Sequence, residues 1–174
     1  MNFKSSKGLT IAELVISLAI LVVLGLVSSL YLINVRRNRA LYADAYAILA
    51  VLRDAQQRAI TQDSIVPDEH WGVHFYSTST TTPFYELFTS PKGIGYPGQQ
   101  YSRLILKSWV TFCNPTYGLA KDLHFENITG LPTDKSGLAN ETYVNVKLKD
   151  NPREYVEIRI DKQGSIVFTD RQDC

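Results

Sequence analysis

The stretch Lys7-Gly-Leu-Thr-Ile-Ala-Glu13 opens an apolar run that continues to Val35, with no charged residue from Leu14 onward. At a rise of about 1.5 Å per residue, a helix of this length crosses a hydrocarbon core of roughly 30 Å. Glu13 is the exception, because a carboxylate near hydrocarbon costs on the order of a few kcal/mol unless it is paired. We therefore expect a membrane-spanning helix in which Glu13 has a function and a partner.

The helical pattern continues beyond this apolar run. No proline occurs between Leu9 and Val66, and apolar residues recur at spacings of three and four. This periodicity predicts one apolar stripe along the helix. We expect a single helix from about Thr10 to about Gln62, whose second half packs on a sheet through the stripe Leu41, Ala45, Ile48, Leu52, Ala55 and Ala59.

After Val66 the pattern changes to the alternation that is typical of strands. Ser90–Gly98, Asp150–Pro152 and Lys162–Gly164 are rich in turn residues and predict loops or turns. The last three strands are expected to form an antiparallel meander, which with the long helix indicates an α+β fold. The expected strands are Trp71–Tyr76, Phe84–Phe88, Leu104–Phe112, Asp122–Glu126, Thr142–Leu148, Tyr155–Ile160 and Ser165–Thr169.

The composition is that of an ordinary globular chain with an added apolar helix. The chain has 174 residues, of which 45% are hydrophobic, and its formal net charge is +1. This balance argues against a domain that binds nucleic acid by bulk charge. The roughly 110 residues that follow the helical N-terminus suffice for one compact domain with its own core.

No residue pattern points to catalysis, a metal or a cofactor. His70 and His74 would lie about 13 Å apart on a strand, so we interpret them as polar residues at a helix-to-strand junction. His124 alternates with Leu123 and Phe125 and is expected to be exposed. There is no nucleophile–histidine–acid arrangement, no nucleotide-binding loop and no cysteine–histidine cluster. The sequence therefore favours a protein that is not an enzyme.

The N-terminus resembles that of type IV pilins and type II secretion pseudopilins. The resemblance rests on a short basic leader ending in Gly8, on Leu9 and Thr10, and on Glu13 four residues beyond Leu9, before the apolar run. It implies that a prepilin peptidase, which is also the N-methyltransferase, cuts after Gly8 and methylates Leu9. It also implies that Glu13 guides filament assembly.

Electrostatics agrees with this resemblance. Cleavage before Leu9 would create an α-amine with a pKa near 8, which is largely charged at neutral pH. That amine, or the amine of a neighbouring subunit, would remove the cost of an isolated carboxylate at Glu13. The alternative is a plain signal anchor in which Glu13 lies at headgroup depth. A secretory signal peptide fits less well, because its apolar core is only about 7–15 residues long.

The resemblance implies a pilin fold with an inner-membrane anchor and a head domain outside the cytoplasm, in the periplasm or at the cell surface. Removing the leader with Lys4 and Lys7 changes the net charge from +1 to −1. The charges that flank the span do not decide its orientation, because arginines also follow it. The expected parts are a leader (1–8), a transmembrane and filament-core half-helix (9–35) and a head (36–174), which includes the amphipathic half-helix (36–62) and a β-sheet region (66–174).

Segments of the head are similar to the GspH/FimT-like branch of minor pseudopilins and minor pilins. They are Leu52–Ile60, Leu123–Pro132 and Asp161–Ile166. The proline that often kinks the first half of a pilin helix is missing, which favours a minor subunit. The expected partners are the peptidase, other pilin or pseudopilin subunits and the inner membrane.

The two cysteines, Cys113 and Cys174, suggest a disulfide, because an exported domain with an even count commonly forms one. The resemblance to the C-terminal disulfide loops of pilins implies the same bond. A loop this long gives roughly 4 kcal/mol of stabilisation in the chain-entropy model. The alternative is two free thiols.

A second function, capture of DNA during uptake, is the alternative within the same family. The candidate contacts Arg153, Arg159, Lys162 and Arg171 lie close together near the C-terminus. Acidic residues alternate with them, whereas a phosphate-binding surface is expected to carry charges of one sign. The competing interpretation of these side chains is a solvated sheet face.

Overall fold

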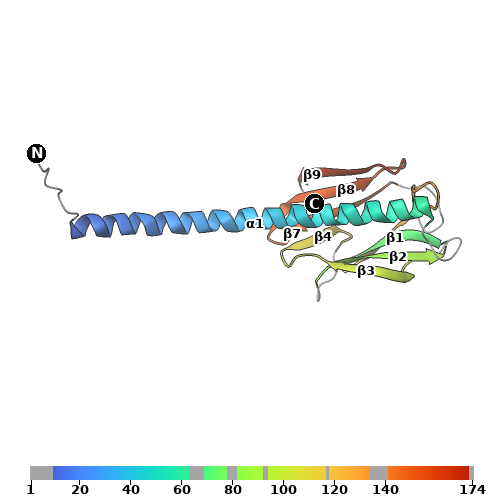
Figure 1. The fold of residues 1–174 in the computed structure, drawn as a ribbon, viewed down its shortest axis with the longest axis horizontal. Helices are drawn as coiled ribbons and strands as arrows, with labels where there is room; N and C mark the ends of the chain where they lie inside the picture. The colour runs from blue at the N-terminus through green and yellow to red at the C-terminus, as the bar shows by residue number, and fades with distance from the viewer. Residues whose placement is uncertain are drawn as a thin grey trace, which may run out of the picture. The chain divides into compact units, whose positions relative to one another are not determined.

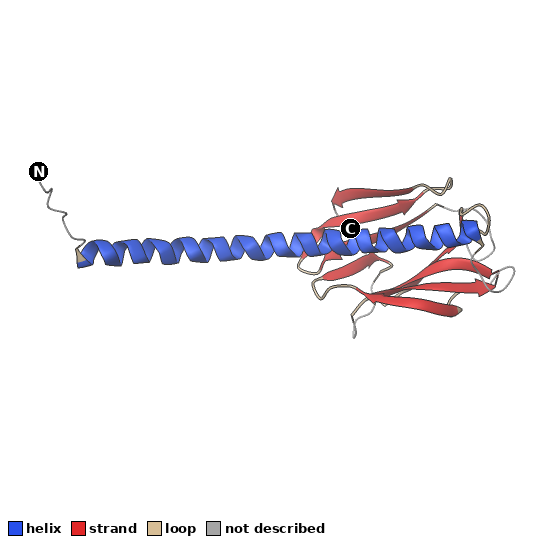
Figure 2. Cartoon of the chain, viewed as in Figure 1, coloured by secondary structure: helices blue, strands red, loops and turns tan. Residues whose placement is uncertain are grey.

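The computed structural model describes residues 10–62, 69–77, 82–91, 94–116, 118–133 and 141–172, except for the side chains of residues 27, 30, 151–154 and 172. One long helix, α1 (Ile11–Thr61), precedes all the strands, as Figure 2 shows, and the expected α+β class is confirmed. The strands are β1 (Glu69–Tyr76), β2 (Phe84–Pro91), β3 (Gln99–Ile105), β4 (Val110–Asn114), β5 (Ala120–Phe125), β6 (Pro132–Thr133), β7 (Thr142–Leu148), β8 (Asn151–Ile160) and β9 (Ile166–Gln172).

The chain divides into two units, one ending at Arg37 and the other beginning at Asn38. Helix α1 contributes residues to both. The first unit contains the apolar half of α1, and the second unit contains the amphipathic half together with all the strands. We call the second unit the head.

The strands of the head form two antiparallel sheets. Sheet A has the order β3-β2-β1-β5-β6, and sheet B has the order β4-β7-β8-β9 (Figure 1). In sheet B, Val144 lies opposite Ile158, which lies opposite Phe168 on the next strand. The meander expected for the last three strands is therefore confirmed.

The region Leu104–Phe112, which was expected to be one strand, is instead the end of β3 and most of β4, and these strands belong to different sheets. The chain leaves sheet A at Leu106, whose N–H donates to the carbonyl of Pro83 (3.0 Å). The next N–H, that of Lys107, donates to Oδ2 of the buried Asp44 on α1 (2.8 Å). A buried carboxylate needs such a donor, so this contact favours a turn over a continuous strand.

A second boundary also differs from expectation. Asn151 and Pro152, which were assigned to a turn, already belong to β8, and the turn lies at Lys149 and Asp150. The cause is a register shift between Lys147 and Leu148, after which Leu148 pairs with Asn151. The hairpin is therefore tighter than the turn residues suggested.

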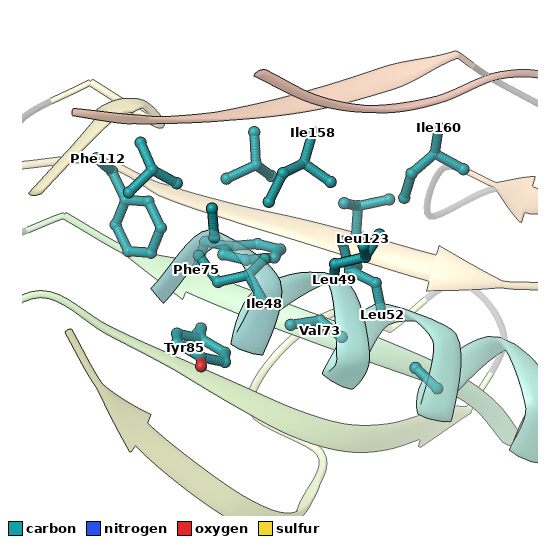
Figure 3. Close-up of a cluster of buried hydrophobic side chains, with 14 of the residues drawn as sticks. Ile48, Leu49, Leu52, Val73, Phe75, Tyr85, Phe112, Leu123, Ile158 and Ile160 are labelled. Atoms are coloured by element: carbon teal, nitrogen blue, oxygen red, sulfur yellow. The ribbon is translucent and has the colours of Figure 1, made fainter. Parts of the chain in front are cut away.

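The core of the head lies between α1 and the two sheets. Figure 3 shows Ile48, Leu49 and Leu52 of α1 beside Val73 and Phe75 of sheet A. The helical stripe expected from sequence is buried along its whole length, from Leu41 to Ala59. Side chains from sheet B that are also buried in this cluster include Phe112, Val144, Val146, Val156, Ile158 and Ile160.

Polar contacts fix the end of α1 against two turns. The side-chain amide of Gln56 donates to the carbonyl of Gly130 (3.0 Å) and to that of Gly164 (2.8 Å). Both glycines have positive φ, and a Cβ on Gly164 would lie 2.9 Å from the Gln56 amide nitrogen. The helix ends at Thr61, and the left-handed backbone of Gln62 (φ 53°) stops the helical hydrogen-bond pattern.

Candidate functional site

The helix N-terminus is built by Thr10 and Glu13, three residues apart. The Thr10 N–H donates to Glu13 Oε2 (2.9 Å), and the Thr10 hydroxyl donates to the same oxygen (3.0 Å). In return, the Glu13 N–H donates to the Thr10 hydroxyl (3.3 Å). This reciprocal pattern is a capping box, which satisfies N–H groups that otherwise lack a partner at a helix start. Glu13 therefore has a local structural role that the sequence analysis did not anticipate.

Both described bonds to the Glu13 side chain use Oε2, so within residues 10–62 no hydrogen bond occupies Oε1. The carboxylate is exposed and keeps one oxygen for a partner outside its own helix turn. Gly8 and Leu9, where cleavage and methylation are expected, lie outside the described residues. Their roles and the assembly role of Glu13 stay predictions.

The apolar half of α1 has no covering within its unit. Leu14, Leu18 and Leu21 are 57%, 60% and 66% exposed, and the described apolar side chains around the whole circumference behave alike. Among the described residues, α1 is the one helix long and apolar enough to cross a membrane. This feature is compatible with the expected single-pass membrane anchor. The kind of membrane and the side on which the head lies stay predictions.

A row of charged and polar side chains, which the sequence analysis did not identify, crosses four strands of sheet A. The register places Arg103 on β3 opposite Glu86 on β2, Glu86 opposite His74 on β1, and His74 opposite Asp122 on β5. Arg103 Nε donates to Glu86 Oε1. His74 Nδ1 lies 2.6 Å from Asp122 Oδ1 and donates to that carboxylate. We call these four side chains the polar row.

Tyr96, in the connection between β2 and β3, covers the polar row. Its ring stacks on His74 with 3.7 Å between ring centroids and 9° between ring planes. Its hydroxyl donates to Glu86 Oε2 (2.6 Å) and accepts from the Gln100 amide (2.9 Å). Its backbone N–H donates to Asp122 Oδ2 (3.2 Å). One residue thus contacts both acids and the histidine of the row.

Each acid of the polar row accepts hydrogen bonds from a basic side chain of the row and from Tyr96. Burial by itself raises the pKa of Asp122, but the hydrogen bond and charge of His74, the Tyr96 N–H and the charge of His124 together bring that pKa below 3.8. Burial, and then the bond and charge of Glu86, raise the pKa of Tyr96 above 10.0. Asp122 is therefore a carboxylate and Tyr96 a neutral donor at neutral pH. Because the charges within the row are paired, we assign it a structural role.

Two expectations about histidines are wrong. His74 lies inside β1 and is buried, so it is not a junction residue. His124, expected to be exposed, is only 4% exposed because Phe88 packs against it edge-to-face with 5.4 Å between ring centroids. The facing residue on β1 is Gly72, where an added Cβ would lie 2.8 Å from the Phe88 ring. In the sequence, the only indication that a ring could pack over His124 was the glycine at position 72, which leaves room for Phe88.

The expected DNA contacts are spread over β8, β9 and the turn between them, and two of them have acidic partners. Arg159 Nη2 lies 2.5 Å from Glu141 Oε1, and Arg171 Nη2 lies 3.4 Å from Glu157 Oε1. Lys162 is exposed in a turn, and the side chain of Arg153 lies outside the described residues. These contacts do not favour a phosphate-binding surface, so the DNA alternative stays a prediction.

Of the two cysteines of the expected disulfide, the structure describes Cys113. Cys113 lies near the end of β4, an edge strand of sheet B, and is half-buried. Cys174 lies outside the described residues, so the bond stays a prediction.

The head also has an open cleft of about 310 Å³ where α1 meets β8 and β9. Tyr42 and Asp170 both line this cleft, and the Tyr42 hydroxyl donates to Asp170 Oδ2 (3.2 Å). Its lining is mixed, consisting of Asn38, Leu41, Tyr42, Tyr155, Val156, Asp170 and Arg171.

In the described parts of the chain, no group of three or more His, Cys, Asp or Glu side chains is placed to hold a metal ion. No family model, curated protein or solved structure matches this chain.

Proposed function

We propose that this chain is a minor pilin or pseudopilin. It would be held in the inner membrane by residues 9–35, with the head outside the cytoplasm. A prepilin peptidase would cut it between Gly8 and Leu9 and methylate Leu9. The mature subunit would then enter a pilus or secretion pseudopilus through its N-terminal helix.

The observation that carries this proposal is the exposed apolar half of α1, which continues into a half that is buried in the head. A helix that is apolar on every side requires lipid or other helices around it. Lipid tails and the side chains of identical helices are both suitable, so one segment fits a bilayer and a filament core. The same helix supplies the core stripe from Leu41 to Ala59, which would fix the head to the fibre.

Glu13 supports assembly over simple anchoring. Inside a helix bundle the carboxylate would be removed from water, and an unpaired buried charge is strongly destabilising. The capping box uses one oxygen and leaves the other for an ammonium group. A plain anchor has no need of such a group at this depth.

Processing is tested by a bulky substitution at the cleavage position. Gly8→Val should leave the precursor uncut, whereas Gly25→Val should be cut normally, because an added Cβ at Gly25 meets nothing within 4 Å. The mass of the protein purified from its own cells distinguishes the two. A mature mass for Gly8→Val, or a wild-type chain that keeps residues 1–8, would refute the proposal.

Assembly is tested separately at Glu13. Glu13→Ala should be processed, yet its share in sheared filaments should fall, while Thr10→Ser keeps a hydroxyl for the capping box and should assemble normally. If Glu13→Ala enters filaments as well as the wild type, the assembly role of Glu13 is wrong.

A further inference from the structure

The first unit has opposite charges at the two ends of one apolar surface. Glu13 lies at the start of α1, no charged residue occurs from Leu14 to Val35, and Arg36 follows directly. Both Glu13 and Arg36 are exposed. Within the residues that the structure describes, Arg36 makes no ion pair, and Glu13 Oε1 accepts no hydrogen bond.

Packing against a second copy has a consequence for these charges. If two such helices pack side by side in the same direction with a small offset, Glu13 of one copy faces apolar side chains of the other. A carboxylate there is unfavourable unless the offset is the short one that brings the neighbour's α-amine beside it. An offset of about 34 Å, the rise of the 23 residues from 13 to 36, instead places Glu13 beside Arg36 of the neighbour. The apolar surfaces remain in contact with further copies at intermediate offsets.

The direction of each side chain around the helix axis decides whether Arg36 or Arg39 can face Glu13 of a neighbour. At about 100° per residue, Arg36 points roughly 140° away from Glu13 around the helix axis. Two copies related by translation face each other from opposite sides, which requires about 180°. The remaining difference of roughly 40° is within the reach of a long arginine side chain. Arg39 points only about 80° from Glu13, so it faces away from such a neighbour.

We propose that Glu13 of one subunit pairs with Arg36 of a neighbouring subunit, and that this ion pair sets a long-range offset between the helices. The inference rests on the proposed function, because insertion in one membrane with all heads on one side makes the helices parallel. Pairing with a neighbour's α-amine concerns a copy at a short offset. The arginine pairing identifies a second, more distant copy as a partner.

The test is a charge exchange in the full chain, expressed in its own cells. Glu13→Arg and Arg36→Glu should each lower the share of the chain in sheared filaments at least about tenfold, as expected when a charge pair is broken within a packed interface. The double variant Glu13→Arg with Arg36→Glu should assemble better than Glu13→Arg alone, because it restores the pair with position 36 although not the bonds of Glu13 to Thr10. The matched control, Glu13→Arg with Arg39→Glu, should not.

A crosslink gives a readout that does not depend on normal assembly levels. Chains with Glu13→Cys and chains with Arg36→Cys, expressed together, should give a crosslinked dimer in the filament fraction after treatment with a thiol-reactive crosslinker about as long as an arginine side chain, because two cysteines at these positions are too short to meet directly. Glu13→Cys with Arg39→Cys should give none. The native cysteines are present equally in both experiments, so they do not explain a difference.

The results separate the inference from the proposed function. If Arg36→Glu assembles like the wild type, or if both double variants recover equally, the ion pair is wrong while the filament function stands. If the wild-type chain never appears in filaments, the proposed function is wrong as well.

Discussion

Removing the hydroxyl of Tyr96 tests whether the polar row stabilises the head as the structure indicates. In Tyr96→Phe the ring still stacks on His74, and the backbone N–H still donates to Asp122. The substitution removes only the 2.6 Å bond to Glu86 and the bond from Gln100. The variant therefore removes one hydrogen bond to a buried carboxylate and one from the exposed Gln100.

The magnitude follows from the burial of Glu86, which is 1% exposed. A hydrogen bond to a charged group contributes about 1.5–3 kcal/mol, and losing it leaves a buried acceptor with one partner fewer. Arg103 still pairs with Glu86, and Tyr96 is itself half-buried, so we expect the lower part of this range. A loss of about 1.5–2 kcal/mol lowers Tm by about 3–8 °C for a chain of this size.

The assay is thermal unfolding of the full chain in a mild detergent, followed by near-ultraviolet circular dichroism. Tyr101→Phe is the matched control, since in the described residues the Tyr101 hydroxyl makes no hydrogen bond while its ring contacts Trp71. An equal Tm for both variants would show that the Tyr96 hydroxyl contributes nothing. Glu86→Gln combined with Tyr96→Phe should be less destabilised than the sum of the two single variants, because they share one bond.

Three further predictions concern the core, the acid response and the cysteines. Leu52→Ala removes a fully buried side chain and should lower the free energy of unfolding by about 2–5 kcal/mol, whereas the exposed Leu24→Ala should leave denaturant unfolding of the head unchanged. The pKa of Asp122 is below 3.8, so its contribution to stability is complete above that pH and is lost as the pH falls through the lower folded pKa. Asp122→Asn should therefore flatten the decline of denaturant midpoints in acid, and an unchanged slope would contradict the assigned pKa. Cys113→Ser and Cys174→Ser should each cost about 4 kcal/mol and give equal unfolding midpoints, and unequal midpoints would argue against a shared disulfide.

The helix and the meander were predictable because their signals are local. The spacing of Leu41, Ile48 and Leu52 reports one buried face of a helix, and the alternation Val144, Val146, Leu148 reports one buried face of a sheet. Such periods depend only on backbone geometry, so they persist whatever packs against them. The capping box was also within reach, because Thr10 and Glu13 have its spacing.

The polar row was not predictable in the same way. His74 and Glu86 alternate with apolar neighbours, and Asp122 precedes the apolar Leu123, as side chains on a wet sheet face do. His74 and Glu86 are buried and Asp122 is half-buried, because Tyr96 covers them. Tyr96 lies in a connecting loop, and no periodic pattern in the sequence shows that such a residue packs over a sheet. The break after β3 was hidden for a similar reason, since Asp44 acts on Lys107 from far along the chain.

Because α1 is also the central element of the head's core, a pull on its N-terminal end has mechanical consequences. Tension along the half of α1 that lies in the head is carried by consecutive backbone hydrogen bonds within that half. There it is distributed over the stripe from Leu41 to Ala59 and over the two bonds of Gln56 near the far end. Extracting the helix would require these contacts to slide past both sheets together, so the head should resist shear along α1 better than force applied to a single edge strand.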